Sequence, residues 1–131
     1  MFSNNQISYV HSSGSSTVHQ VQAAPLLRDP TAHYHIFVRY DVNKANAADR
    51  LVITINGVTP SYSINNPPTQ NYLGGRIGSA VPHWIGRNLN AGPTYSDGYS
   101  SEINFIDGGG GAVTANDFGE FNADGVWVPK K

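Results

Sequence analysis

The sequence contains no cysteine, and charged residues occupy only 13% of its 131 positions. The absence of cysteine excludes disulfide bonds and thiolate metal sites. The formal net charge is -1, and the sequence has no block of lysine or arginine. Because nucleic acid is bound through clustered basic side chains, this composition argues against a nucleic-acid partner.

Long apolar runs are also missing. No stretch approaches the ~20 residues that a helix needs to cross a bilayer, so we expect no membrane partner. Residues 1–6 have neither the basic part nor the apolar part of a signal peptide. We therefore expect a protein that is made in the cytoplasm without an export leader of its own.

Polar and turn-forming residues take the place of the missing charge. The chain has 13 Asn, 12 Ser and 7 Thr, together with 14 Gly and 8 Pro. These residue types favour turns and short strands over long helices. Because hydrophobic residues still make up 39% of the chain, they can fill one core, which predicts a single all-β domain over residues 1–131.

Apolar and polar residues alternate with a period of two in the first half of the chain, which predicts strands. We expect a hairpin of residues 7–10 and 17–21, and a strong strand at residues 33–41. In that strand, the side chains on one face are predicted to point to the core, and those on the other face point away. The core-facing residues are Tyr34, Ile36, Val38 and Tyr40, and the opposite face carries His33, His35, Phe37 and Arg39.

An Asn-Gly pair marks the end of the next predicted strand, residues 51–55. Asn56 and Gly57 favour a type I′ turn, in which both central residues have positive φ. We therefore expect residues 62–64 to return beside residues 51–55. A polar connection at residues 43–49 is predicted to contain one helical turn.

The second half of the chain shows weaker patterns. Residues 65–78 contain paired prolines and glycines and predict a long surface loop, and strands are predicted at residues 83–87 and 99–106. Thr114 and Asp117 have the spacing of a weak capping box for one helical turn, which Gly119 would close. The apolar residues 126–129 should pack against another part of the protein.

Taken together, several segments resemble laminin-G-like, concanavalin A-like domains. They are residues 33–41 followed by 50–57, then 83–87, 97–99, 102–108 and 117–121. The closing residues 125–131, Gly-Val-Trp-Val-Pro-Lys-Lys, are especially similar to the version found in bacteriophage virion proteins. The resemblance covers about residues 27–131 and implies a reduced, mostly antiparallel jelly-roll β-sandwich, with residues 1–26 as an atypical N-terminal hairpin.

The resemblance also implies a role. We expect a structural protein of the virion surface, synthesised in the host cytoplasm, such as a capsid decoration or cement protein that clamps neighbouring subunits. Its partners would be major capsid or fibre subunits and further copies of itself, with a trimer favoured, since a reduced sandwich exposes strand edges. The main alternative is a carbohydrate-binding tail-fibre or adhesin module, followed by a glycoside hydrolase.

Aromatic residues in polar surroundings are the candidates for contact with a partner or a glycan. They are Tyr62, Tyr72, Tyr95 and Trp127, and the amide-rich loops around them suit the recognition of hydroxyl groups. Calcium is considered at a sandwich rim because some laminin-G-like domains bind it there. Its candidate ligands are Asp41, Asp97 and Asp107, although aspartate also occurs commonly in turns.

Two further patterns resemble functional sites, but we do not expect either to be one. Glu102, Asn104 and Asp107 resemble the Glu-x-Asp-x-x-Glu strand of retaining glucanases, but an asparagine replaces the middle aspartate, and residues five apart point to opposite faces of a strand. We therefore predict no catalytic residue. His33 and His35 share a strand face, as zinc ligands do, but spacing identifies no third ligand among His11, His19 and His83.

Overall fold

A computed structural model describes residues 2–3, 5–13, 16–73, 80, 85–88, 94–95, 98–108 and 112–130. The predictions for His83, Asp97 and residues 74–78 lie outside this part of the chain. The described residues form strands and two short 3₁₀ helices, η1 and η2, with no α-helix among them. Within the same residues, no helix has the length and apolar character required to span a membrane. The all-β expectation is therefore confirmed.

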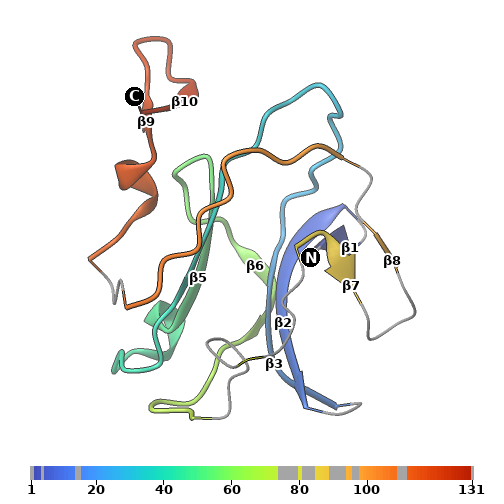
Figure 1. Cartoon of the computed structure of the whole chain (residues 1–131), viewed down its shortest axis with the longest axis vertical. Coiled ribbons are helices and arrows are strands. Elements are labelled where there is room, and N and C mark those ends of the chain that lie inside the picture. The colour runs from blue at the N-terminus through green and yellow to red at the C-terminus, as the bar shows by residue number, and fades with distance from the viewer. Residues whose placement is uncertain are drawn as a thin grey trace.

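Four strands form the largest sheet, in the order β1-β2-β3-β6, and neighbouring strands are antiparallel (Figure 1). These strands are β1 (Phe2–Ser3), β2 (Gln6–Ser13), β3 (Ser16–Ala23) and β6 (Tyr62–Asn66). The predicted N-terminal hairpin is confirmed as β2–β3, and its strands are longer than expected. Its register places His11 directly opposite His19, just before a bulge.

The second sheet is the hairpin of β4 (Ile36–Tyr40) and β5 (Leu51–Ile55). The predicted helical turn between them is present as η1 (Ala47–Asp49), and the Asn46 side chain accepts a hydrogen bond from the Ala48 N–H, 3.2 Å away. β4 begins three residues later than predicted. Its ladder ends at Ile55, because His35 instead exchanges hydrogen bonds with Asn56 through the backbone and the Asn56 side chain.

The core lies where the inner face of β4–β5 meets β2 and β3. Its buried members are aliphatic: Ile7, Val21, Ala23, Leu51 and Ile53. Partly buried residues pack around them, namely Tyr9, Leu27, Ile36, Tyr40, Ile55 and Tyr62. The two antiparallel sheets thus bury apolar faces against each other, while the jelly-roll order of strands stays a prediction.

The prediction of which β4 side chains face the core is largely confirmed. Ile36 and Tyr40 pack against the core as expected, whereas Val38 keeps 41% of its surface exposed. The large side chains on both faces of residues 33–41 predicted a central strand, which was wrong: among the described residues, β4 pairs only with β5.

Residues 62–64 do not return beside β5, which corrects the sequence prediction. The turn itself forms as expected, with φ of 50° at Asn56 and 75° at Gly57, and closes with a bridge between Ile55 and Val58. The chain then leaves β5 at Pro60, whose ring nitrogen has no hydrogen to donate to a ladder. The following strand, β6, pairs with β3.

Two predictions of strands in the second half of the chain were also wrong, the one at residues 99–106 wholly and the one at residues 83–87 in part. Residues 99–106 form no strand, and Glu102 within them has a positive φ of 52°, which interrupts an extended backbone. Of the predicted strand at residues 83–87, the structure describes residues 85–87, and among these only Arg87 lies in a strand, after a φ of 72° at Gly86. That strand, β7 (Arg87–Asn88), pairs with β8 (Thr94–Tyr95).

The last part of the chain forms η2 (Ala115–Asp117) and the hairpin of β9 (Gly119–Phe121) and β10 (Trp127–Pro129). The predicted turn at Thr114 is confirmed: the Asp117 carboxylate accepts hydrogen bonds from the Thr114 N–H at 2.7 Å and the Thr114 hydroxyl at 2.9 Å. Gly119 does not close this turn, since Phe118 is the C-cap and Gly119 begins β9.

Candidate functional site

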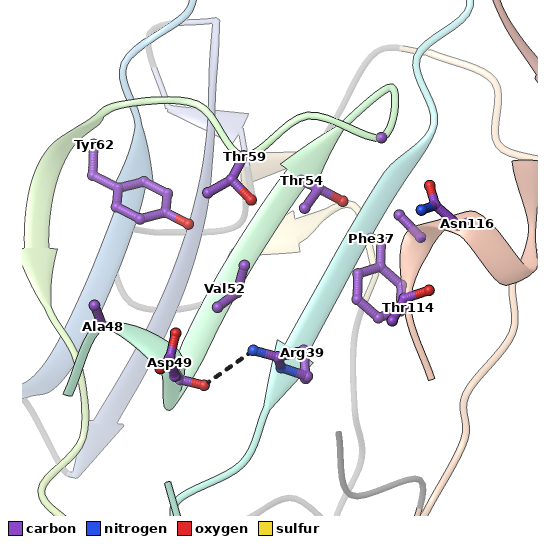
Figure 2. A pocket seen from close by; sticks show the side chains of 12 residues that line it. Phe37, Arg39, Ala48, Asp49, Val52, Thr54, Thr59, Tyr62, Thr114 and Asn116 are labelled. Carbon is purple, nitrogen blue, oxygen red and sulfur yellow. Dashed lines mark hydrogen bonds between the residues drawn. The ribbon is translucent and has the colours of Figure 1, made fainter. Parts of the chain in front are cut away.

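A pocket of about 410 Å³ lies on the outer face of the β4–β5 hairpin, the face turned away from the core (Figure 2). Both strands, η1, η2 and the segment from Gly57 to Tyr62 contribute to its walls. The lining residues are Phe37, Arg39, Ala48, Asp49, Val52, Thr54, Gly57, Thr59, Tyr62, Thr114, Ala115 and Asn116.

Strand register builds the floor of this pocket. Phe37 lies opposite Thr54, and Arg39 lies opposite Val52, so all four side chains share the outer face. Alternation in the sequence had predicted that Phe37 and Arg39 would lie opposite the core-facing residues. The floor therefore combines an aromatic ring, an aliphatic side chain, a hydroxyl and a guanidinium group.

Two polar atoms in the floor are buried without a hydrogen-bond partner among the described residues. They are the Thr54 hydroxyl oxygen and Arg39 Nε. Thr54 is only 8% exposed, and Arg39 makes one long hydrogen bond, 3.5 Å from Nη2 to the backbone oxygen of Asp49. Buried polar groups almost always have a partner, so these atoms leave unused hydrogen-bonding capacity at the pocket.

Local contacts fix both ends of the pocket wall. At one end, the Arg50 guanidinium holds the loop before η1 by donating hydrogen bonds to two backbone oxygens. Nε lies 2.8 Å from the Lys44 oxygen, and Nη2 lies 2.6 Å from the Ala45 oxygen. At the other end, Lys130 Nζ donates a hydrogen bond to the backbone oxygen of Asn116, 2.6 Å away. Hydrogen bonds from Thr114 lower the pKa of Asp117, so its carboxylate remains an acceptor at neutral pH.

Trp127, a candidate for partner or glycan contact, packs inside its own chain beside the pocket. Its indole stacks on His35 with ring centroids 5.7 Å apart and meets Phe121 edge-on at 5.1 Å. It also lies against Gly57 and Gly119, where an added Cβ would overlap the ring. The prediction that residues 126–129 pack against another part of the protein is confirmed, and that part is the same chain.

A second cluster of rings lies between the sheets, away from this pocket. The His11 and His19 rings stack at 4.6 Å, and Tyr9, Tyr40 and Tyr72 surround His19. Burial, followed by the neighbouring His11, lowers the pKa of His19, and burial raises the pKa of Tyr9 and of Tyr40. The rings of His19, Tyr9 and Tyr40 are therefore uncharged at neutral pH.

The structure places the predicted aromatic candidates in different parts of the molecule. Tyr62 lines the pocket, and its hydroxyl bonds to the Ile53 backbone at 3.1 and 3.2 Å. Tyr72 belongs to the histidine cluster, and Tyr95 is 68% exposed on β8. Each remains a candidate for contact with a partner, but no single aromatic patch is formed by these three residues and Trp127.

The predicted metal ligands do not gather in the described part of the chain, where no group of three or more His, Asp or Glu residues could hold a metal ion. Asp41 instead closes a turn by accepting from the Asn43 N–H at 3.1 Å, and it pairs with Lys44 at 3.7 Å. Asp107 and His33 are exposed, and His35 faces Trp127.

The glucanase-like residues lie on an irregular exposed segment. Glu102 and Asp107 are both exposed, and Asn104 donates a hydrogen bond to the Glu102 backbone oxygen at 3.1 Å. Retaining glycosidases hold two carboxyl groups about 5–5.5 Å apart across the bond that they cleave. The strand on which such a pair would depend does not form here.

Most of the pocket was not predicted from the sequence. Phe37 and Arg39 were placed on the correct face, but Val52, Thr54 and Asn116 were not singled out, since only the register and the position of η2 bring them together. Searches for a matching family, for similar curated proteins and for similar solved structures found none.

Proposed function

We propose that the chain is a structural subunit of a bacteriophage virion surface, a capsid decoration or cement protein that assembles with copies of itself and with neighbouring capsid or fibre subunits. The exposed segment at residues 98–108, named here the apolar segment, carries this proposal. The resemblance of the C-terminal residues to phage virion proteins supports the location. The expected assembly is a homotrimer.

The apolar segment exposes large hydrophobic side chains that a monomer would leave in water. Tyr99 is 107% exposed, Ile103 58%, Phe105 71% and Ile106 51%. Burying one such side chain is worth about 1.5–3 kcal/mol, so covering the set strongly favours association. Exposed apolar patches on soluble proteins commonly mark sites of protein–protein contact.

The backbone of the same segment suggests how the contact forms. Within the described residues, the segment pairs with no strand, and three of its four residues at 103–106 are apolar. Residues 103–106, which follow the interruption at Glu102, can add as a strand to the sheet edge of another subunit, where backbone hydrogen bonds supply affinity. The low charge of the chain suits such contacts, because charged residues are depleted from the centres of interfaces.

Light scattering during size-exclusion chromatography tests the assembly. We expect the full chain to elute as a trimer or larger oligomer, and the double variant Ile103→Asp, Phe105→Asp to elute as a monomer with an unchanged circular dichroism spectrum. Leu73→Asp is the matched control, because Leu73 is 96% exposed but lies outside the apolar segment. A monomeric wild-type chain, or a double variant that still assembles, would contradict the proposal.

The virion part of the proposal has its own test. The purified chain should co-sediment with phage particles and saturate at a fixed ratio to the capsid subunit, and the double variant should not. An assembled chain that never binds particles would leave the assembly intact and remove the decoration role.

A further inference from the structure

Residues 112–130, named here the C-terminal unit, make no hydrogen bond to any other described part of the chain. Their hydrogen bonds are internal. Lys130, for example, donates through its backbone N–H to the Phe118 oxygen at 3.0 Å and through Nζ to the Asn116 oxygen at 2.6 Å. Figure 1 shows this unit, in red, at one end of the molecule. A change of docking partner would therefore break no hydrogen bond between the unit and the rest of the described residues.

Aromatic rings hold the C-terminal unit on the outer face of β4–β5. Between ring centroids, Phe118 lies 6.2 Å from His35 and 6.1 Å from Phe37. Trp127 stacks on His35 at 5.7 Å and also lies against Gly57. Packing of this kind depends on shape and apolar surface, so the β4–β5 face accepts the unit equally well from its own chain and from a second copy.

The apolar segment, residues 98–108, leads directly to the C-terminal unit. In a single copy its large apolar side chains are exposed to water. The sequence continues from it through glycines 109–111, and glycine restricts the direction of the backbone less than any other residue type. Fully extended, the 11 residues from 98 to 108 span about 36–40 Å. That length is more than twice the radius of gyration of about 14 Å expected for a compact chain of 131 residues, so the unit can reach a neighbouring copy.

We propose that copies of the chain exchange their C-terminal units in the assembly, so that the unit of each copy docks on the outer face of β4–β5 of the next. This inference rests on the self-association in the proposed function and names the contact that carries it. Exchange keeps the ring contacts that a single copy makes, and it adds the burial of the apolar segment where that segment crosses between copies. Head-to-tail exchange can close into a ring, which fits the expected trimer.

Cross-linking between engineered thiols tests the exchange, because the native chain has no cysteine. Thr59, on the segment after β5, and Asn116, in η2, line the same pocket from the two sides of the contact, and both are exposed. The full chain carrying Thr59→Cys and Asn116→Cys is treated with a short bismaleimide and separated under denaturing conditions. We expect covalent dimers and trimers.

Light scattering on the same sample separates failure of the exchange from failure of the proposed function. Cross-linked product that migrates only as a monomer, from a chain that is an oligomer in solution, would overturn the exchange and leave the assembly standing. A chain that is monomeric in solution would overturn both. The control pair is Asn116→Cys with Lys130→Cys, two positions within the unit, which should link only inside one chain. Covalent trimers from this control in equal yield would show that copies are linked without exchange and would overturn the proposal.

The double variant Ile103→Asp, Phe105→Asp gives a second test with the Thr59 and Asn116 thiol pair. It removes the apolar surface that the exchange buries, so the unit should return to its own chain. The cross-linked product should then migrate as a monomer, in a yield similar to that of the covalent oligomers of the parent. Covalent trimers that persist in this variant would overturn the proposal, because the exchange would not depend on the segment that crosses between copies.

Discussion

The two faces of the β4–β5 hairpin are covered in different ways. Leu51 and Ile53, on the inner face, are at most 1% exposed and pack among aliphatic side chains of β2 and β3. On the outer face, the end nearest Gly57 is covered by Trp127, and beside it lies the pocket with Thr54. The same two strands therefore carry close apolar packing on one side and a pocket with a mixed polar and apolar lining on the other.

This difference places close packing and unpartnered polar atoms on opposite faces of a single element. The inner face satisfies the ordinary requirements of a core, in which space is filled and polar groups are absent. The outer face keeps buried polar atoms without a partner among the described residues, and such atoms lower the stability of the folded chain. A hairpin held firmly from one side can present such groups on the other.

The largest expected effect comes from truncating the inner face. Ile53→Ala should lower the free energy of unfolding by about 2–5 kcal/mol, because a fully buried side chain leaves a cavity. Its neighbour Val52 points to the outer face and lines the pocket, so Val52→Ala should cost about 1 kcal/mol or less. Urea unfolding measures both. An equal loss in the two variants would mean that the faces do not differ as described.

An intermediate effect is expected where Trp127 covers the outer face. Gly57→Ala places a methyl group into the indole ring and adds the strain of a positive φ, for a combined cost of about 2–4 kcal/mol. Gly125→Ala is the matched control, since Gly125 has a nearly equal φ of 73° and nothing within 4 Å of its added Cβ. Thermal unfolding should show a smaller loss, about 1 kcal/mol, in the control.

Removing the indole ring tests whether the overlap is the cause. In a Trp127→Ala background, Gly57→Ala should cost no more than Gly125→Ala does. A full cost that persists without the tryptophan would show that Trp127 does not lie against Gly57 in solution.

The smallest expected effect is the pH dependence of stability that His19 causes. The pKa of His19 lies below its ordinary value of 6.5 because of burial and His11, so the unfolded chain binds a proton more readily than the folded chain. The contribution of neutral His19 to stability is fully present above pH 6.5, and it is lost as the pH decreases from 6.5 toward the pKa of His19 in the folded chain. The urea midpoint should therefore be lower at pH 5.5 than at pH 7.5.

Two histidine variants assign this pH dependence. His19→Gln should reduce the difference in urea midpoint between pH 5.5 and pH 7.5. His33→Gln should leave this difference unchanged, because His33 is exposed. Tyr9 and Tyr40, which also face His19, stay neutral throughout, since burial raises their pKa. An unchanged difference in His19→Gln would place the dependence elsewhere.

Local features of the fold were predictable from the sequence. Asn56 and Gly57 adopt the positive φ values that their residue types favour, and Thr114 and Asp117 form the predicted turn. Alternation separated Ile36 and Tyr40 from Phe37 and Arg39. In each case the cause lies within a few neighbouring residues, where backbone preference and side-chain period act directly.

Long-range partners were not predictable in the same way. The pairing of β6 with β3 and the position of η2 over Thr54 depend on contacts between distant segments, which no local pattern encodes. Residues 99–106 show the converse: alternation made a strand plausible, but a strand requires a partner, and none pairs with it in the described part of the chain. The pocket combines both difficulties, since its walls come from segments between residues 37 and 116.

The position of Trp127 against Gly57 has a consequence for the order of events during synthesis. The hairpin and its inner contacts come from residues 7–62, which leave the ribosome well before residue 127 is added. The indole therefore closes the outer face only after the inner core can already have formed, and it must close a long loop to do so. A nascent chain stalled before residue 127 would display β4–β5 with one face packed and the other bare, which is the stage at which a chaperone would find apolar surface to hold.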